Sequence, residues 1–365
     1  MLRPKLNIER LVPAVHGGIN CFELEKLGIS PEDVLDFSVS TNPFGPPPGT
    51  KEALGQASID RYPDSEATEL RLLLARKLTV TPDNLLIGNG STELIRLVAT
   101  AYFGHEDLVI VPQPTYSDYE IACCLVSAQV IKQLMLEETD FRLNVAEVVD
   151  LIRKHQPKGL FLCNPNNPTG QYLSKEEVKE ILSAARDSLV ILDEAYIAFT
   201  ENAWPSLDLI GQNNLVVLRS MTKDYALAGL RLGYVVAAES IISVLKRVRP
   251  PWNVSSVAQA AGVFALKADG YLEACGMKIK EAKEFMVKEL GKLGLSSLPS
   301  QANFFLVKVG DAASFSQALL KRGILIRDCS SFGLPNYIRL APRPIAECQR
   351  LLTTIKEPEV YRYAR

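Results

Sequence analysis

Cysteine and histidine occur in this sequence without any of the spacings that bind metal ions. The chain has three histidines and seven cysteines, and no two cysteines form a Cys-x-x-Cys pair. Structural zinc sites require such spacings. An odd number of unpaired cysteines is also typical of reduced thiols rather than of a disulfide framework. We therefore predict neither a metal site nor disulfide bonds.

Long apolar runs and runs of one charge sign are also missing. Charges and prolines interrupt the apolar residues of MLRPKLNIERLVPAVHGG, and no later stretch reaches the length of a membrane span. The 40 Lys and Arg residues are scattered and nearly balance the 42 Asp and Glu residues. We expect a cytoplasmic protein that binds neither nucleic acid nor a membrane.

Between residues 66 and 240, short apolar runs alternate with helical patterns. The runs are LLIGNG, LVIVP, GLFLC, LVILDEAY and LVVLRS. Runs of branched aliphatics between helices are typical of buried parallel strands. Leu70, Leu73, Leu74 and Leu78 fall on one helical face, and Ser174 with Glu177 predicts a helix N-cap. The pattern predicts an α/β fold with a mostly parallel central sheet flanked by helices.

Beyond Pro250 and Pro251 the pattern changes. A helical stretch over about 255–293 is followed by a smaller α+β pattern with strands near ANFFLVKV, ILIRDC and YIRLAP. We predict three parts: an N-terminal arm that belongs partly to a small domain (1–45), a large domain (46–254) and a small C-terminal domain (255–365).

Lys223 follows the apolar run LVVLRS in the segment SMTKDYALAGLRLGY. A lysine forms an imine with an aldehyde cofactor if burial and a nearby positive charge help it to lose its proton. Ser220 and Thr222 could offer hydroxyls, and Arg231 a guanidinium, to a phosphate on that cofactor. An ordinary surface lysine would show the same local pattern.

Two further segments end apolar runs with polar side chains. Asp193 and Tyr196 lie in LVILDEAY, and Asn167 lies in the turn NPNNPTG. At the carboxyl edge of an α/β sheet, an aspartate could pair with a protonated ring nitrogen. The tyrosine and the asparagine could donate hydrogen bonds to a ring oxygen. A helix N-cap or a metal ligand remains the alternative for Asp193.

The segment IGNGSTEL leaves a predicted strand through two glycines and starts a helix. The backbone amides of Gly90, Ser91 and Thr92 could therefore bind phosphate at the positive end of that helix. Many loops contain Gly-Asn-Gly, so this segment indicates a phosphate site only in combination with the other segments.

These four segments, in this order, resemble the fold-type I pyridoxal-phosphate enzymes of the aminotransferase class I/II superfamily over nearly the whole chain. The resemblance implies pyridoxal 5'-phosphate as cofactor and Lys223, Asp193 and Tyr196 as catalytic residues. It also implies that Tyr116 stacks on the cofactor ring. Tyr62 would reach the cofactor phosphate of a neighbouring subunit, and the protein would then be a homodimer.

Two groups within the superfamily fit best, and both act on small phosphorylated amines. HGGIN, LDFSVSTNPFGPP and ILIRDCSSF are similar to segments of the threonine-phosphate decarboxylases of cobalamin biosynthesis, although FSVSTNPFG departs from their usual Ala-Asn-x-Asn run. These segments favour the decarboxylase, with a histidinol-phosphate or related amino-acid aminotransferase as the alternative. The resemblance implies the following substrate-binding residues: His16, Gly17, Asn42, Arg327 and Arg339.

Two other classes fit less well. A non-catalytic pyridoxal-phosphate module of a transcription factor would carry a helix-turn-helix domain, for which we see no pattern. A nicotinamide-dependent dehydrogenase would show Gly-x-Gly-x-x-Gly after its first strand, and the sequence has none there.

Overall fold

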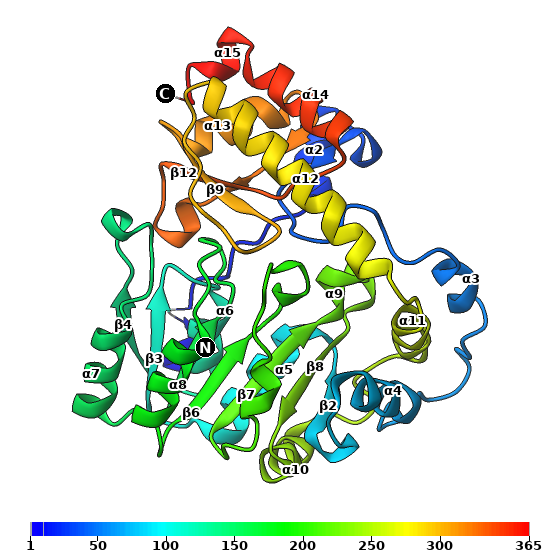
Figure 1. Ribbon diagram of the computed structural model, residues 1–365, viewed down its shortest axis with the longest axis vertical. Coiled ribbons are helices and arrows are strands. Elements are labelled where there is room, and N and C mark those ends of the chain that lie inside the picture. The colour runs from blue at the N-terminus through cyan, green and yellow to red at the C-terminus, as the bar shows by residue number, and fades with distance from the viewer. Residues whose placement is uncertain (1, 10, 365) are drawn as a thin grey trace.

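The computed structural model describes residues 2–9 and 11–364, and a seven-stranded sheet forms the centre of its larger lobe (Figure 1). The strand order is β2-β8-β7-β6-β5-β3-β4, and only β8 runs opposite to the others. The strands are β2 (Leu85–Gly88), β3 (Leu108–Gln113), β4 (Gln129–Leu134), β5 (Gly159–Cys163), β6 (Leu189–Asp193), β7 (Leu215–Ser220) and β8 (Gly233–Ala237). The predicted α/β fold with a mostly parallel sheet is confirmed.

Helices cover both faces of this sheet because successive strand residues point to opposite sides. One apolar core lies under α5 (Gly90–Tyr102), α6 (Asp118–Leu125) and α10 (Glu239–Val248). The other lies under α4 (Thr68–Leu78), α7 (Val145–His155), α8 (Lys175–Ala184) and α11 (Ser256–Leu266). Val190 and Leu192 of β6 belong to the second core, and Ile191 between them belongs to the first.

A second lobe has its own apolar core and its own sheet. The long helix α12 (Tyr271–Lys292) leads into it from beside α11 (Figure 1). Its sheet has the order β11-β12-β9, and β1 pairs with β10 in parallel. The elements are β1 (Leu35–Asp36), β9 (Phe305–Lys308), α13 (Ala312–Leu320), β10 (Ile324–Leu325), β11 (Arg327–Asp328), β12 (Tyr337–Leu340), α14 (Ile345–Ile355) and α15 (Pro358–Tyr361).

Four further α-helices are short. They are α1 (Leu6–Glu9), α2 (Cys21–Leu27), α3 (Thr50–Leu54) and α9 (Met221–Asp224). Among them α1 packs on α6 and α3 packs on α11 of the larger lobe. The N-terminal chain crosses from α6 of the larger lobe to the second lobe, where Phe37 enters the core.

Several local predictions can be compared with the structure. The Ser174 hydroxyl accepts a hydrogen bond from the Glu177 amide, and Glu177 accepts one from the Ser174 amide, so the predicted cap is confirmed. The helical stretch after Pro251 is two helices, because Gly270 takes a left-handed conformation between α11 and α12. Strands β4 and β8 were not predicted. The three domain ranges stay a prediction. Helix α11, which lies in the range 255–365, packs on α3 and α4 of the range 46–254.

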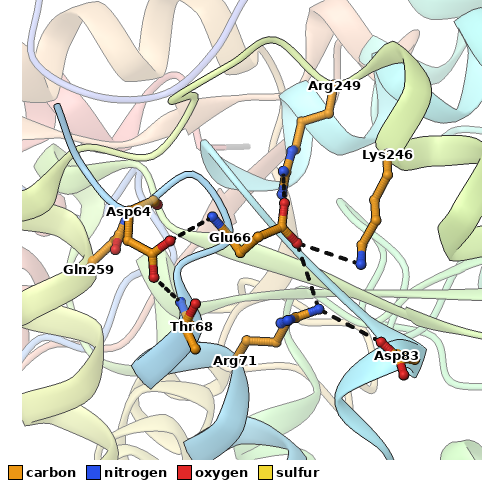
Figure 2. Close-up of polar contacts among 8 residues, drawn as sticks. All are labelled: Asp64, Glu66, Thr68, Arg71, Asp83, Lys246, Arg249 and Gln259. Carbon is orange, nitrogen blue, oxygen red and sulfur yellow. Dashed lines mark hydrogen bonds and ion pairs between the residues drawn. The ribbon is translucent and has the colours of Figure 1, made fainter.

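Glu66 lies at the centre of a charged cluster on the larger lobe (Figure 2). It forms an ion pair with Arg249, and its Oε2 lies 3.5 Å from Lys246 Nζ and 3.7 Å from Arg71 Nη1. Arg71 also lies 3.9 Å from Asp83. We call these five residues the Glu66 cluster. It links the start of α4 to the end of α10.

The sequence predicts no metal site, no disulfide bond and no membrane span. All seven cysteines are free thiols. Across residues 2–9 and 11–364, no group of three or more metal-ligating side chains is arranged to hold an ion. Over the same residues, no helix is both long enough and apolar enough to cross a membrane. A cytoplasmic location stays a prediction.

Candidate active site

A cavity of about 270 Å³ lies at the carboxyl ends of the parallel strands and reaches the second lobe. Most of the predicted site residues line it, although they come from distant parts of the sequence. They are His16, Gly17, Ser91, Thr92, Tyr116, Asn167, Asp193, Tyr196, Thr222, Lys223, Arg231, Arg327 and Arg339. Parallel strands place the residues that follow them at one edge of the sheet, which explains why Tyr116, Asn167 and Lys223 converge.

Lys223 projects into this cavity from the short helix α9, directly after β7. Burial lowers the pKa of its amine to about 8, and the positive charges of Arg339 and Arg231 act in the same direction. The backbone of this turn is held by Asn42, whose amide donates to Lys223 O (2.8 Å) and whose side chain donates to Asp224 O (3.0 Å). A neutral amine is therefore accessible near neutral pH.

Asp193 is the last residue of β6 and is buried at the base of the cavity. Its carboxylate accepts hydrogen bonds from the Tyr119 hydroxyl (2.7 Å) and the Ala195 amide (2.9 Å). Burial nevertheless raises its pKa to about 6. A buried carboxylate in this state would be stabilised by a cationic ligand.

Asn167 and Tyr196 meet on the same wall of the cavity. The Asn167 amide nitrogen donates to the Tyr196 hydroxyl (3.5 Å), and its oxygen accepts a hydrogen bond from Arg339. Burial raises the pKa of Tyr196 well above its usual value, so the phenol stays protonated. These three predicted residues thus form one hydrogen-bonded chain.

Arg231 packs against the turn that leads from β2 into α5. Gly90 has φ of +78°, which favours glycine, and a Cβ there would lie 2.9 Å from Arg231 Nη2 and displace the guanidinium. Ser91 and Thr92 follow it on the cavity wall. The hydroxyls of Ser220 and Thr222 are buried and hydrogen-bond to each other. Backbone amides, hydroxyls and a guanidinium are therefore gathered on one side.

Arg327 of β11 and Arg339 of β12 enter the cavity from the second lobe, and both are buried. Arg339 donates to Ser38 O (2.6 Å), and Arg327 donates to Val15 O and to the Ser331 hydroxyl (both 2.7 Å). Burial lowers the pKa of Arg327. Within the described chain, no carboxylate lies within 4 Å of either guanidinium.

Four predicted residues do not line the cavity. Gly90 and Ser220 lie behind its wall, and Asn42 supports the Lys223 turn as described above. Tyr62 lies on the surface, 77% exposed, and its ring stacks on Trp252 at a centroid distance of 4.3 Å. Its predicted contact with a neighbouring subunit stays a prediction.

Tyr119, Cys163 and residues 38–40 also line the cavity, and the sequence does not predict them as site residues. Tyr119 stacks on Phe161 at 4.8 Å and holds Asp193. A signal for Tyr119 was available, because PTYSDY places a second tyrosine three residues after Tyr116. Residues 38–40 are brought in by the β1–β10 pairing, and nothing in their own sequence announces it.

The chemistry of the lining residues fits pyridoxal 5'-phosphate. The aldehyde has an amine with a lowered pKa, the ring nitrogen has the buried carboxylate of Asp193, and the ring oxygen has protonated donors. The phosphate has the Gly90 turn with Arg231 and the Thr222 hydroxyl. Each group of the cofactor thus has a matching partner on the cavity wall.

Comparisons with known proteins agree with this fit. The profile of "Aminotransferase class I and II" matches residues 32–355. A histidinol-phosphate aminotransferase from Thermoanaerobacter sp. (strain X514) is 37% identical over 310 residues, 84% of this chain and 87% of that protein. The structure of the same enzyme from Sinorhizobium meliloti, in complex with pyridoxal-5'-phosphate, has a TM-score of 0.87 and 26% identity over 99% of this chain and 98% of that one.

A third similar structure is L-threonine-O-3-phosphate decarboxylase from Porphyromonas gingivalis. It has a TM-score of 0.77 and 28% identity over 88% of this chain and 98% of that one. The family profile covers most of the chain, and the cavity carries the matching residues. The chain therefore belongs to the class I and II aminotransferases, enzymes that use pyridoxal 5'-phosphate as cofactor.

Proposed function

We propose that this protein is a histidinol-phosphate aminotransferase, which transfers an amino group between a phosphorylated amine and a 2-oxo acid. The observation that carries the proposal is the charge of the cavity. Lys223, Arg231, Arg327 and Arg339 line it, and Asp193 is the only carboxylate among the described lining residues. A cofactor phosphate and a substrate phosphate together would balance this excess of positive charge.

The relatives support the histidinol-phosphate aminotransferase over the threonine-phosphate decarboxylase, which the HGGIN segment favours. Curated relatives at 32–37% identity carry the name histidinol-phosphate aminotransferase, and several span 96% of this chain. The decarboxylase is represented by a structural neighbour with lower identity than these relatives.

When bound, the cofactor withdraws electrons from the bonds at the carbon that bears the amino group. In our proposal the Lys223 amine would hold the cofactor and would move a proton at that carbon. Asp193 would stabilise a protonated ring nitrogen. Tyr196 and Asn167 would supply donors for the ring oxygen, and Tyr116 would offer an aromatic surface for the ring.

Arg327 and Arg339 would bind the anionic end of the substrate and so set its orientation. The bond that stands perpendicular to the cofactor ring is the one that is weakened. The position of these two guanidiniums relative to Lys223 therefore decides whether a proton or a carboxylate leaves the reacting carbon. His16 and Gly17 lie on the same part of the wall.

A threonine-phosphate decarboxylase is the second candidate, and one observation favours it. The structure places His16 and Gly17 of the HGGIN segment on the cavity wall. The decarboxylase from Porphyromonas gingivalis is 28% identical to this chain. We therefore test both reactions together.

The experiment is product analysis by mass spectrometry with the pyridoxal-phosphate-loaded enzyme. One sample contains histidinol phosphate and 2-oxoglutarate, and the other contains O-phosphothreonine. Formation of glutamate in the first sample, without CO₂ in the second, supports the aminotransferase. Release of CO₂ with aminopropanol phosphate, and no glutamate, would overturn it in favour of the decarboxylase.

We also propose that the working unit is a homodimer. Tyr62 and Trp252 form a stacked aromatic pair that is 77% and 46% exposed on the single chain, and Ile59, three residues before Tyr62, is 86% exposed. Exposed apolar groups of this kind are typical of interfaces. Sedimentation velocity would give twice the chain mass, and Tyr62→Ala should weaken cofactor retention. A monomer with full activity would contradict the proposal.

A further inference from the structure

Residues 15–18 pass along the cavity, and contacts from both lobes hold them there. Val15, His16 and Gly17 line the cavity. Arg327 of β11 donates a hydrogen bond to Val15 O (2.7 Å), and the Gly18 amide donates to the Ser38 hydroxyl (2.8 Å). We call residues 15–18 the arm segment. It is fixed to the second lobe at both ends.

Gly17 shows how closely the arm segment approaches its support. A Cβ at this position would lie 2.7 Å from Ser38 O. Contacts of carbon with a backbone oxygen at this distance are repulsive, so any other residue would displace the arm segment. The second glycine of HGGIN has φ of +112° and also favours glycine.

On the side of the larger lobe, His16 meets Asp118, the first residue of α6. The His16 Nε2 lies 3.4 Å from Asp118 Oδ2, and the His16 ring lies 5.8 Å from the Tyr116 ring. Asp118 is only 3% exposed, and its Oδ2 accepts no hydrogen bond from the described residues. Its Oδ1 lies 3.8 Å from Arg96.

A buried carboxylate is costly unless a cation or a hydrogen-bond donor compensates it. His16 approaches Asp118 Oδ2 from the cavity side, where His16 is half exposed, and Tyr116 of the same wall also interacts with this carboxylate. Docking of the arm segment therefore brings an imidazole nitrogen within ion-pair distance of Asp118, and an imidazole with a proton on Nε2 would compensate this carboxylate.

We propose that Asp118 is a positioning residue for substrate binding: it holds His16, and with it the arm segment, over the cavity beside Arg327. This proposal rests on the proposed function, because it assumes a substrate with an anionic group. Both hydrogen bonds of Arg327 leave from Nη2, so Nε and Nη1 can bind an anion while the arm segment stays docked.

The first test measures the arm segment without any substrate. Hydrogen exchange of residues 15–18 is compared in the pyridoxal-phosphate-loaded wild type and in Asp118→Asn, which keeps the size of the side chain and removes its charge. We expect exchange to be roughly tenfold faster in the variant. Unchanged exchange would overturn the proposal. Glu120→Gln is the matched control, because Glu120 lies on the same helix and pairs with Lys132 at 2.9 Å.

The second test measures kinetics with histidinol phosphate and with histidinol, which lacks the phosphate. Asp118→Asn should raise KM for the phosphorylated amine about five- to tenfold. Its kcat and its KM for histidinol should change less than about twofold. A general structural defect would change the KM values for both substrates and kcat together, and that result would count against the proposal.

The third test asks whether Asp118 acts through His16. We expect Asp118→Asn to add nothing to the KM effect of His16→Gln, because the two residues would serve one contact. Additive effects would show that Asp118 acts elsewhere. If Asp118→Asn does not fold, Gly17→Ala displaces the arm segment while α6 stays intact, and it should give the same selective rise in KM.

The two proposals fail in different ways. If the wild type has the same kcat/KM for histidinol as for histidinol phosphate, the proposed function fails. The exchange experiment still decides whether Asp118 holds the arm segment. If only O-phosphothreonine reacts, the kinetic comparison is made with O-phosphothreonine and threonine.

Discussion

Glu66 and Asp193 are both carboxylates with several basic side chains nearby, yet their surroundings differ. Around Glu66, three cations lie within 4 Å. Burial raises the pKa of Glu66, but the hydrogen bond from Arg249 and the charges of the three cations together outweigh burial and lower it. In the cavity, burial dominates and raises the pKa of Asp193 to about 6, while it lowers that of Lys223 to about 8.

The difference separates a structural cluster from a binding site. Opposite charges in the Glu66 cluster compensate each other directly, so the cluster needs no ligand (Figure 2). The charges of the cavity lack such partners within the described chain, and burial leaves them unfavourable. Ligands of matching charge would stabilise them, and this gain adds to binding.

Lys223→Met, a change in the cavity, should have the largest effect on activity. Proton transfer by a positioned group contributes about 10²–10⁴-fold to a rate, so we expect transamination to fall by at least roughly 10³-fold. Mass spectrometry after borohydride reduction should find the cofactor attached to the wild type and not to the variant. A covalent adduct in the variant would remove Lys223 from its proposed role.

The same variant should be more stable than the wild type without cofactor. The pKa of Lys223 falls from 10.5 to about 8 on folding, so the unfolded chain binds more protons between these values. The wild type therefore gains stability as pH rises from about 8 to 10.5. Lys223→Met should be more stable by roughly 1–3 kcal/mol at pH 7, and this difference should shrink above pH 8.

Urea unfolding of the cofactor-free proteins at pH 7 and pH 9.5 measures the stability difference and its decrease with pH. Together with the loss of activity, a gain in stability at pH 7 would establish that the buried amine serves function at the expense of the fold. A variant that is less stable than the wild type at pH 7 would contradict this explanation.

Arg339→Lys should have an intermediate effect. A lysine keeps the charge but loses the guanidinium that reaches both Ser38 O and Asn167. Hydrogen bonds to charged groups contribute about 1.5–3 kcal/mol, so kcat/KM for the phosphorylated amine should fall roughly 10- to 100-fold. The KM for 2-oxoglutarate, measured in parallel, shows whether the same guanidinium also binds the acceptor. An unchanged kcat/KM for the amine would exclude Arg339 from substrate binding.

Glu66→Gln should have the smallest effect and should act on stability alone. Its carboxylate is about one third exposed, so solvent screening limits the expected loss to about 1 kcal/mol at pH 7. Because folding lowers the pKa of Glu66 from 4.5, this contribution is present above pH 4.5 and is lost as pH falls further. Thermal unfolding at pH 7 and pH 4 checks it. A large loss of kcat would contradict the structural assignment of this cluster.

The local rules of the chain predicted the sheet and the helix ends because they depend on neighbouring residues. The apolar runs around Ile110 and Ile191 became buried strands, and Ser174 capped its helix. Strand β8 escaped prediction because Gly233 and Tyr234 follow the Lys223 turn without a clear boundary. Strand β4 did so because Lys132 and Gln133 interrupt its apolar pattern.

The sequence by itself predicted the cofactor, because the segments that carry Lys223, Asp193 and Asn167 resemble one superfamily when they are taken together and in order. Only the tertiary structure decided what surrounds them. The pKa of Lys223 is lowered by burial and by Arg339, which enters from the second lobe, and the pKa of Asp193 is raised by burial. The contact of His16 with Asp118 joins residues that are about one hundred positions apart. Burial and charge act through space, so the order of residues along the chain cannot fix them.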